Sequence, residues 1–136
     1  TSDEFGDSLD PIDVGTGRTV KSLSTRGYHV VALLDDDSVK NWGDGSDGLL
    51  GLGYSVIGSI GDEPGEMGDS LPSVLLSNDD GRYVTSLASG STFTCALLDD
   101  GSVKCWGDNS KGALGLGLSN ASIGALEDAM VDALPS

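Results

Sequence analysis

Internal repetition at a spacing of 64 residues is the feature that most limits what this chain can fold into. When residues 20–53 are aligned with residues 84–117, 20 of the 34 positions are identical. The best-matched run covers residues 32–44 and 96–108, and in the second copy it reads Ala-Leu-Leu-Asp-Asp-Gly-Ser-Val-Lys-Cys-Trp-Gly-Asp. Repeats of this kind are units that bury their apolar surface against neighbouring units. The sequence therefore predicts two copies of one structural unit.

Shorter repeated segments outside this run indicate the boundaries of the units. The tetrapeptide Gly-Asp-Ser-Leu occurs at residues 6–9 and 68–71, and the segment 132–136 resembles residues 69–73. We therefore divide the chain into a first repeat with its N-terminal connector (1–60), a second repeat with an acidic connector (61–122) and the start of a third connector (123–136). Both ends fall within connectors, so we expect a fragment of a larger propeller or repeat array.

Each unit is expected to be all-β, with antiparallel strands joined by tight turns. The chain has 21 glycines among its 136 residues, a content that suits many turns. Asp99-Asp100-Gly101 is typical of a type I turn closed by a glycine in the left-handed region, and Asp37 is one of the few residue types that can replace that glycine. In the second unit, β-branched and aromatic residues predict strands over residues 82–87, 92–98 and 102–106.

The register of this hairpin brings the two cysteines together. A three-residue loop pairs Leu97 with Val103 and, two residues further on, Cys95 with Cys105. That pair falls at a non-hydrogen-bonded site, where the Cα atoms are about 4.5 Å apart and within disulfide range. We predict a Cys95–Cys105 disulfide; the alternative is two small buried thiols in a reducing compartment. The first unit has no cysteine, so the bridge would be a local constraint rather than a requirement of the fold.

The run Ala-Leu-Leu-Asp-Asp-Gly-Ser-Val-Lys-Cys-Trp-Gly-Asp-Asn (96–109), followed by residues 112–117, resembles the regulator-of-chromosome-condensation repeat. The family pattern also has Gly, two variable residues and His ahead of this run, and each unit keeps half of it, in residues 90–93 and 26–29. The resemblance implies two tandem β-propeller-type blades. Complete family members form a seven-bladed propeller of four-stranded blades and serve in nucleotide exchange, chromatin binding, photoreception or scaffolding.

Charge narrows the class of partner. The formal net charge is −15, which repels the phosphates of nucleic acids and the headgroups of anionic membranes. No apolar run is long enough to cross a membrane as a helix. Two blades cannot close a ring, so we expect contacts with other protein chains, with further blades of the same parent chain or, as a homo-oligomer, with copies of this chain.

The sequence contains no set of residues that predicts catalysis or cofactor binding. His29 is the only histidine, and a packing role is favoured over catalysis because Phe93 takes its place in the second unit. The glycine-rich stretches are not followed by a helix signal, which favours turns over phosphate binding. Acidic clusters at 35–37, 78–80 and 99–100 lack the alternating spacing of calcium loops. We therefore predict no catalytic, cofactor-binding or metal-ligating residues, and no enzyme.

The aligned repeats also indicate candidate contact residues. Trp42 and Trp106 occupy equivalent positions and are expected to pack between blades, where a large ring with one N–H donor fits. Arg26 replaces the pattern glycine in the first unit, and we interpret Arg26, Tyr28 and His29 as interface candidates.

We interpret the chain as a non-enzymatic protein interaction or scaffold module within a larger assembly. The alternative is a regulatory propeller, either a guanine-nucleotide exchange factor or a lectin-like propeller that binds a ligand. The predicted disulfide and the Asn120-Ala121-Ser122 triplet, a candidate N-glycosylation site, favour an extracellular or organelle-lumenal location over the cytoplasm.

Overall fold

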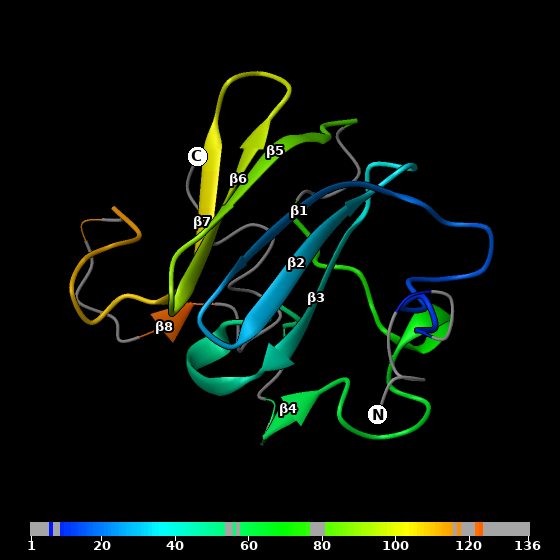
Figure 1. Cartoon of the computed structure of the whole chain (residues 1–136). Helices are drawn as coiled ribbons and strands as arrows, with labels where there is room; N and C mark the ends of the chain where they lie inside the picture. Colours follow the sequence, from blue (N-terminus) through cyan, green and yellow to red (C-terminus); the bar gives the residue numbers. More distant parts are fainter. Residues whose placement is uncertain are drawn as a thin grey trace.

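Two antiparallel four-stranded sheets lie side by side, each formed by one repeat (Figure 1). The computed structural model describes residues 6, 9–53, 56, 58–76, 81–115, 117 and 122–123. The first sheet contains β1 (Val20–Arg26), β2 (His29–Leu34), β3 (Val39–Asp44) and β4 (Ser59–Ile60), in that spatial order. The second contains β5 (Val84–Ser89), β6 (Phe93–Leu98), β7 (Val103–Asp108) and β8 (Ser122–Ile123). Short 3-10 turns, η3 (Ser46–Gly48) and η4 (Gly68–Ser70), lie in the connections.

The predicted all-β fold with two tandem units is confirmed. The three longer strands of the second unit begin and end within about two residues of the predicted ranges, which is ordinary scatter for strand ends. The fourth strand of each sheet has only two residues. Such a short strand has no recognisable sequence pattern, and it was expected only from the family resemblance.

The hairpin between the second and third strands has the predicted register in both units. Leu97 pairs with Val103 and Cys95 with Cys105. In the second unit the loop closes with Gly101 at φ 85°, and in the first Asp37 takes the same left-handed conformation at φ 67°. Local turn chemistry therefore fixes which side chains share a face of each sheet.

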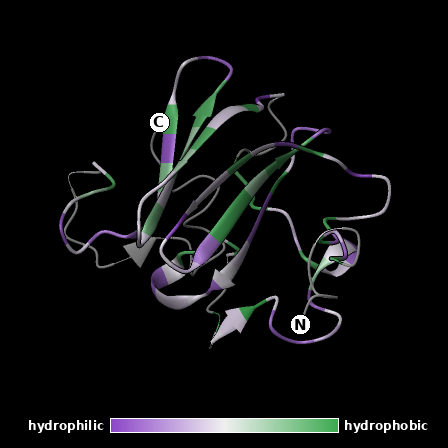
Figure 2. Ribbon diagram, in the orientation of Figure 1, coloured by the Kyte–Doolittle hydropathy of each residue, from purple (hydrophilic) through white to green (hydrophobic). Residues whose placement is uncertain are grey.

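A hydrophobic core joins the two sheets. Its buried members come from the first sheet, the second sheet and the segment that links them, and they are Val31, Leu33, Val39, Val74, Leu76, Val84, Ala96, Leu98 and Trp106. Figure 2 shows hydrophobic residues along β2 and β6, and hydrophilic residues at the hairpin loops. A smaller cluster of Val14, Ala32 and Leu34 covers the other face of β2. The main core therefore lies between the blades rather than within one of them.

Trp106 is the largest side chain in this core and is fully buried. Its indole N–H donates to the carbonyl oxygen of Leu49 in the first unit at 3.1 Å, and the side-chain amide of Asn41 donates to the same oxygen at 3.0 Å. Trp42, its equivalent, is half-buried and packs against the smaller cluster of the first sheet. Of the two tryptophans, only Trp106 therefore connects the two blades of this chain.

The linking segment 61–76 is fixed against the first sheet by polar contacts. The ammonium group of Lys40, which is buried, donates to the carbonyl oxygen of Gly68 at 2.6 Å. Further along, the backbone N–H of Val74 donates to the carbonyl oxygen of Val39 at 2.8 Å. These contacts direct Val74 and Leu76 into the core between the sheets.

Replacing Trp106 with alanine should lower the free energy of unfolding by about 3–5 kcal/mol, because it creates a cavity and leaves the Leu49 carbonyl with one donor fewer. Trp42→Ala is the matched control and should cost clearly less, since that ring is only half-buried. Guanidinium unfolding followed by circular dichroism measures both. Equal losses at the two positions would contradict the view that one tryptophan joins the blades.

Candidate interaction surface

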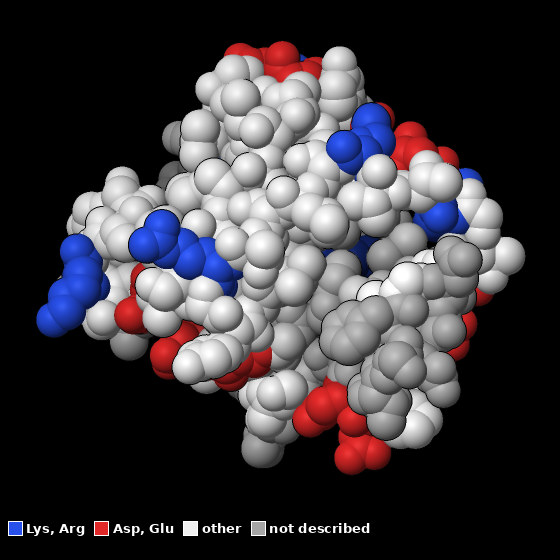
Figure 3. All heavy atoms as spheres, viewed as in Figure 1, with Lys and Arg blue, Asp and Glu red and all other residues white. Residues whose placement is uncertain are grey.

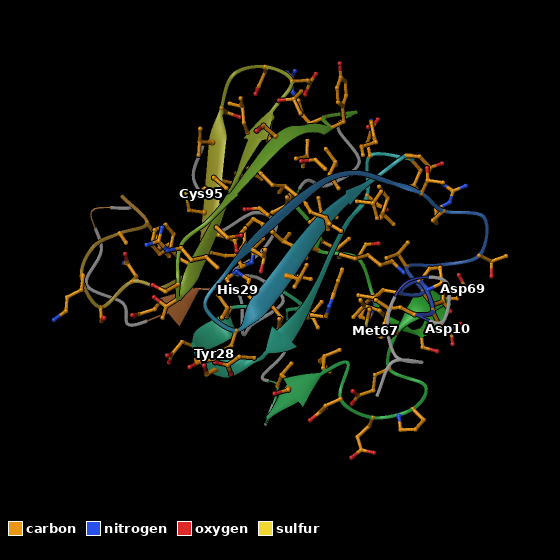
Figure 4. The ribbon with its side chains drawn as sticks, viewed as in Figure 1. Asp10, Tyr28, His29, Met67, Asp69 and Cys95 are labelled. Carbon is orange, nitrogen blue, oxygen red and sulfur yellow. A yellow bond between two sulfur atoms is a disulfide. The ribbon has the colours of Figure 1, made fainter. Side chains whose placement is uncertain are left out.

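Tyr28 projects from the tip of the β1–β2 hairpin and is the most exposed of the large hydrophobic residues that the structure describes, at 85% (Figure 4). The preceding residue, Gly27, has a φ of 67°, and a Cβ atom there would lie 2.5 Å from the carbonyl oxygen of Ser91. Glycine is therefore required, because this tip lies directly against the β5–β6 turn of the other unit. The two neighbouring tips form one continuous surface.

Arg26 lies at the end of β1, beside a hollow of about 460 Å³ between the two hairpin tips. The hollow is lined by Arg26, Ala88, Ser89, Gly90, Ser91, Phe93 and Cys95. The guanidinium group forms no ion pair with any carboxylate in the described part of the chain, although the net charge is −15. Figure 3 shows how acidic groups gather along the lower edge and top of the visible face, with a few separate basic patches. Among the described residues, Arg26 is thus a cation without a carboxylate partner.

His29 does not belong to this outer surface, because it is buried between the two sheets (Figure 4). Its Nε2 atom is 2.9 Å from the hydroxyl oxygen of Thr94, so the imidazole forms part of the contact between the blades. Burial lowers the pKa of His29 below its ordinary value of 6.5, with opposing contributions from the Arg26 backbone and the Asp44 carboxylate. The folded chain therefore favours neutral imidazole.

The free energy of unfolding should fall as the pH drops below about 6.5. There the unfolded chain takes up a proton on His29 that the folded chain resists, and the loss levels off below the folded-state pKa. His29→Gln keeps a hydrogen-bonding group but does not titrate, so it should remove this part of the pH dependence. Urea unfolding between neutral and mildly acidic pH measures the effect, which would be refuted by identical pH profiles for both proteins.

The structure joins Cys95 and Cys105 by a disulfide across β6 and β7, with a Cα–Cα distance of 4.1 Å. Both residues are half-buried on the face of the second sheet that points away from the first. Val31 and Asn41 hold the equivalent pair of positions in the first sheet and are completely buried. There the Asn41 amide reaches the Leu49 carbonyl, so a polar contact takes the place of the covalent bond.

Reducing the disulfide should destabilise the chain by about 2–3 kcal/mol, the value expected for closing a loop whose ends are 10 residues apart. The control is the double variant Cys95→Val with Cys105→Asn, which copies the first sheet and should unfold identically with and without reductant. Unfolding curves in both conditions test this. A wild-type curve that does not respond to complete reduction would show that the bridge adds no stability.

One arginine in each unit forms salt bridges to the acidic hairpin loop, and the sequence analysis did not predict these contacts. Arg18 contacts Asp35 and Asp36, with 2.9 Å to the latter carboxylate, and Arg82 contacts the equivalent Asp99 and Asp100. The serine two residues further along donates to Asp36 and Asp100, and this hydrogen bond holds the pKa of each carboxyl below its usual range. The signal was available, because Arg18 and Arg82 are themselves 64 residues apart.

Several predicted features concern residues that the structure does not describe. Asn120 and the whole acidic cluster at 78–80 lie outside the described residues. Within the described ranges, no group of three or more His, Cys, Asp or Glu side chains is arranged to hold a metal ion. No helix in the same ranges has the length and hydrophobicity needed to cross a bilayer.

The two sheets with their hairpins define the chain as a tandem pair of propeller-type blades. The family model of the regulator of chromosome condensation (RCC1) repeat matches residues 84–113, which cover β5, β6 and β7. The resemblance noted in the sequence is thereby confirmed, and the two units are repeats of the RCC1 type.

Similar proteins include human E3 ubiquitin-protein ligase HERC2, which is 33% identical over 93 residues (68% of this chain and 2% of HERC2), and the ultraviolet-B receptor UVR8 of Arabidopsis thaliana, 29% identical over 107 residues (79% of this chain and 22% of UVR8). The crystal structure of Prp20p from Saccharomyces cerevisiae has the same fold, with a TM-score of 0.63 at 17% identity, covering 85% of this chain and 26% of Prp20p. The chain thus spans at most about a quarter of the length of these proteins.

Proposed function

We propose that this pair of blades is a non-enzymatic module that binds a protein partner at the hairpin tips. The observation that carries the proposal is the combination of Tyr28, 85% exposed, with Arg26, which has no carboxylate partner among the described residues and lines the adjoining hollow. Tyrosine and arginine are the residue types that most often dominate the binding energy of protein interfaces. A partner that places a carboxylate against Arg26 and an apolar group in the hollow fits this surface best.

Proteins with similar folds support a binding role without identifying the partner. One crystal structure shows Kap60 bound to yeast RCC1 (Prp20), and this chain matches that RCC1 chain with a TM-score of 0.63 at 17% identity, covering 88% of this chain and 26% of RCC1. Blades of this fold can therefore belong to a protein that binds other proteins. For the present chain the same use is our proposal, as is an oxidising compartment, which the disulfide favours.

Selection of random peptides displayed on phage against the immobilised chain tests the hairpin-tip site. Peptides that contain Asp or Glu beside an aromatic residue should be enriched, and their binding should weaken at least tenfold for the double variant Arg26→Ser with Tyr28→Ser. Lys111→Ser removes an exposed cation elsewhere and should bind them normally. Near-UV circular dichroism should show that all three proteins are folded.

Two outcomes would overturn the proposal. One is that no enriched peptide distinguishes the double variant from the wild type, which would exclude the hairpin tips as the binding site. The other is turnover of a small-molecule substrate by the purified chain, since the proposed module has no chemistry of its own.

A further inference from the structure

The contact between the two hairpin tips is polar, unlike the rest of the contact between the sheets. The hydroxyl oxygen of Ser24 accepts a hydrogen bond from the backbone N–H of Ser89 at 2.9 Å, and Nε2 of His29 is 2.9 Å from Oγ1 of Thr94. Elsewhere the two sheets meet through the hydrophobic core. A neutral hydrogen bond adds little net stability, because water replaces it when it breaks, whereas apolar burial adds much. The tips can therefore separate while the core keeps the blades together.

His29 is the titratable side chain in this polar contact. It is only 1% exposed, and its Nδ1 atom is buried without a hydrogen-bond partner in the described part of the chain. A neutral imidazole has one N–H group, and the hydroxyl of Thr94 can accept it. Protonation gives the ring a positive charge and a second N–H group, so the proton on Nδ1 would be buried without an acceptor. The protonated ring therefore fits poorly between closed tips.

The groups that surround His29 do not offset this cost. Burial lowers the pKa of His29 below 6.5, although the backbone of Arg26 at the end of β1 and the carboxylate of Asp44 at the end of β3 both favour the protonated ring. The second sheet contributes Thr94 from β6 and its strand partner Ser89 from β5, and neither side chain is charged. When the tips open, water reaches the imidazole and its pKa returns towards 6.5. Protonation thus favours the open form.

The proposed binding site lies across the same contact. Arg26 of the first unit lines the hollow at the tips together with residues of the second unit, among them Ser89 and Ser91. Tyr28 is held to the first sheet, because its carbonyl oxygen accepts a hydrogen bond from the N–H of Asp44 at 2.9 Å. Separation of the tips would leave Arg26 and Tyr28 on one blade and the other lining residues on the next. The site is therefore complete only while the tips are closed.

We propose that protonation of His29 opens the contact between the hairpin tips and releases the partner bound there, so that the site binds near neutral pH and releases in mildly acidic solution. The release rests on the function proposed above, whereas the opening depends on this chain alone. Because one proton is taken up and the pKa of the open form is near 6.5, lowering the pH from 7 to 5 shifts the equilibrium towards the open form by at most about 25-fold.

Amide hydrogen exchange followed by NMR measures the opening without a ligand. The N–H of Ser89 donates across the tips to Ser24, so its protection, corrected for the intrinsic exchange rate, should fall about 5- to 25-fold between pH 7 and pH 5. The N–H of Val74 donates to the carbonyl oxygen of Val39 elsewhere in the contact between the blades and should keep its protection. An equal loss at both amides would mean that the whole chain unfolds, which would overturn the proposal.

Two variants assign the response to His29. His29→Gln keeps a hydrogen-bonding side chain that does not titrate, so the protection of Ser89 should no longer depend on pH. Thr94→Asp places a carboxylate where the hydroxyl meets the imidazole, so the closed form should become more favourable as the pH falls from 7 to 5. The chain has a single histidine, so one imidazole NMR signal reports the pKa directly. That pKa should lie below 6.5 in the wild type and above it in Thr94→Asp.

Peptide binding tests the release. A peptide without histidine, enriched on the immobilised chain at neutral pH, should bind the wild type at least about fivefold more weakly at pH 5 than at pH 7. Its affinity for His29→Gln should be nearly the same at both pH values, and this variant also corrects for titration of the peptide's own carboxylates. Fluorescence anisotropy of the labelled peptide measures both affinities.

The outcomes separate the two proposals. Protection of Ser89 that stays constant between pH 7 and pH 5 in the wild type would overturn the opening, whatever the hairpin tips bind. Opening without any change in peptide affinity would overturn the release. If no peptide distinguishes the double variant at Arg26 and Tyr28 from the wild type, the function proposed above fails and the release fails with it, while the exchange of Ser89 still decides whether the tips open.

Discussion

A sheet that is apolar on both faces needs a neighbour on each side, and this requirement governs the structure. The first sheet meets it on one side with the second sheet, and on the other with a few residues of the N-terminal connector. Each fully buried aliphatic side chain contributes about 1.5–3 kcal/mol, while a small domain is stable by only about 5–15 kcal/mol in total. Separating the two sheets would expose several such side chains at once. Each blade is thus stable because of its contact with the next.

The two repeats stabilise the centre of the hairpin between their second and third strands in different ways. At the centre of the second and third strands, the first unit has Val31 beside Asn41, and the second has the Cys95–Cys105 disulfide. The Asn41 amide is buried and shares the Leu49 carbonyl with Trp106, so its hydrogen bond ties the first blade to the second. A cross-strand bond holds its own hairpin without help from a neighbour. The same position therefore uses a contact between blades in the first sheet and a covalent bond in the second.

Local features were predictable from the sequence, because they depend on few residues. The type I turn with its left-handed closing residue set the register, and the register brought the cysteines opposite each other. Burial was not predictable, because it depends on which face has a neighbour: identical leucines at 33 and 97 are 3% and 39% exposed. For His29 the sequence favoured a packing role, but it did not indicate the partner, Thr94, which lies 65 residues away. Nothing in the sequence indicated that the Leu49 carbonyl accepts these hydrogen bonds, because every residue has a backbone carbonyl.

The half-exposed disulfide also has a practical consequence. A small thiol reagent must approach one sulfur atom of the bond from the solvent side. On the face of the second sheet that points away from the first, that approach is partly open. Any protein surface that covers this face would block that approach. The rate at which the bond is reduced therefore reports, without a label or a substitution, what fraction of the chains has this face of the second sheet covered at a given moment.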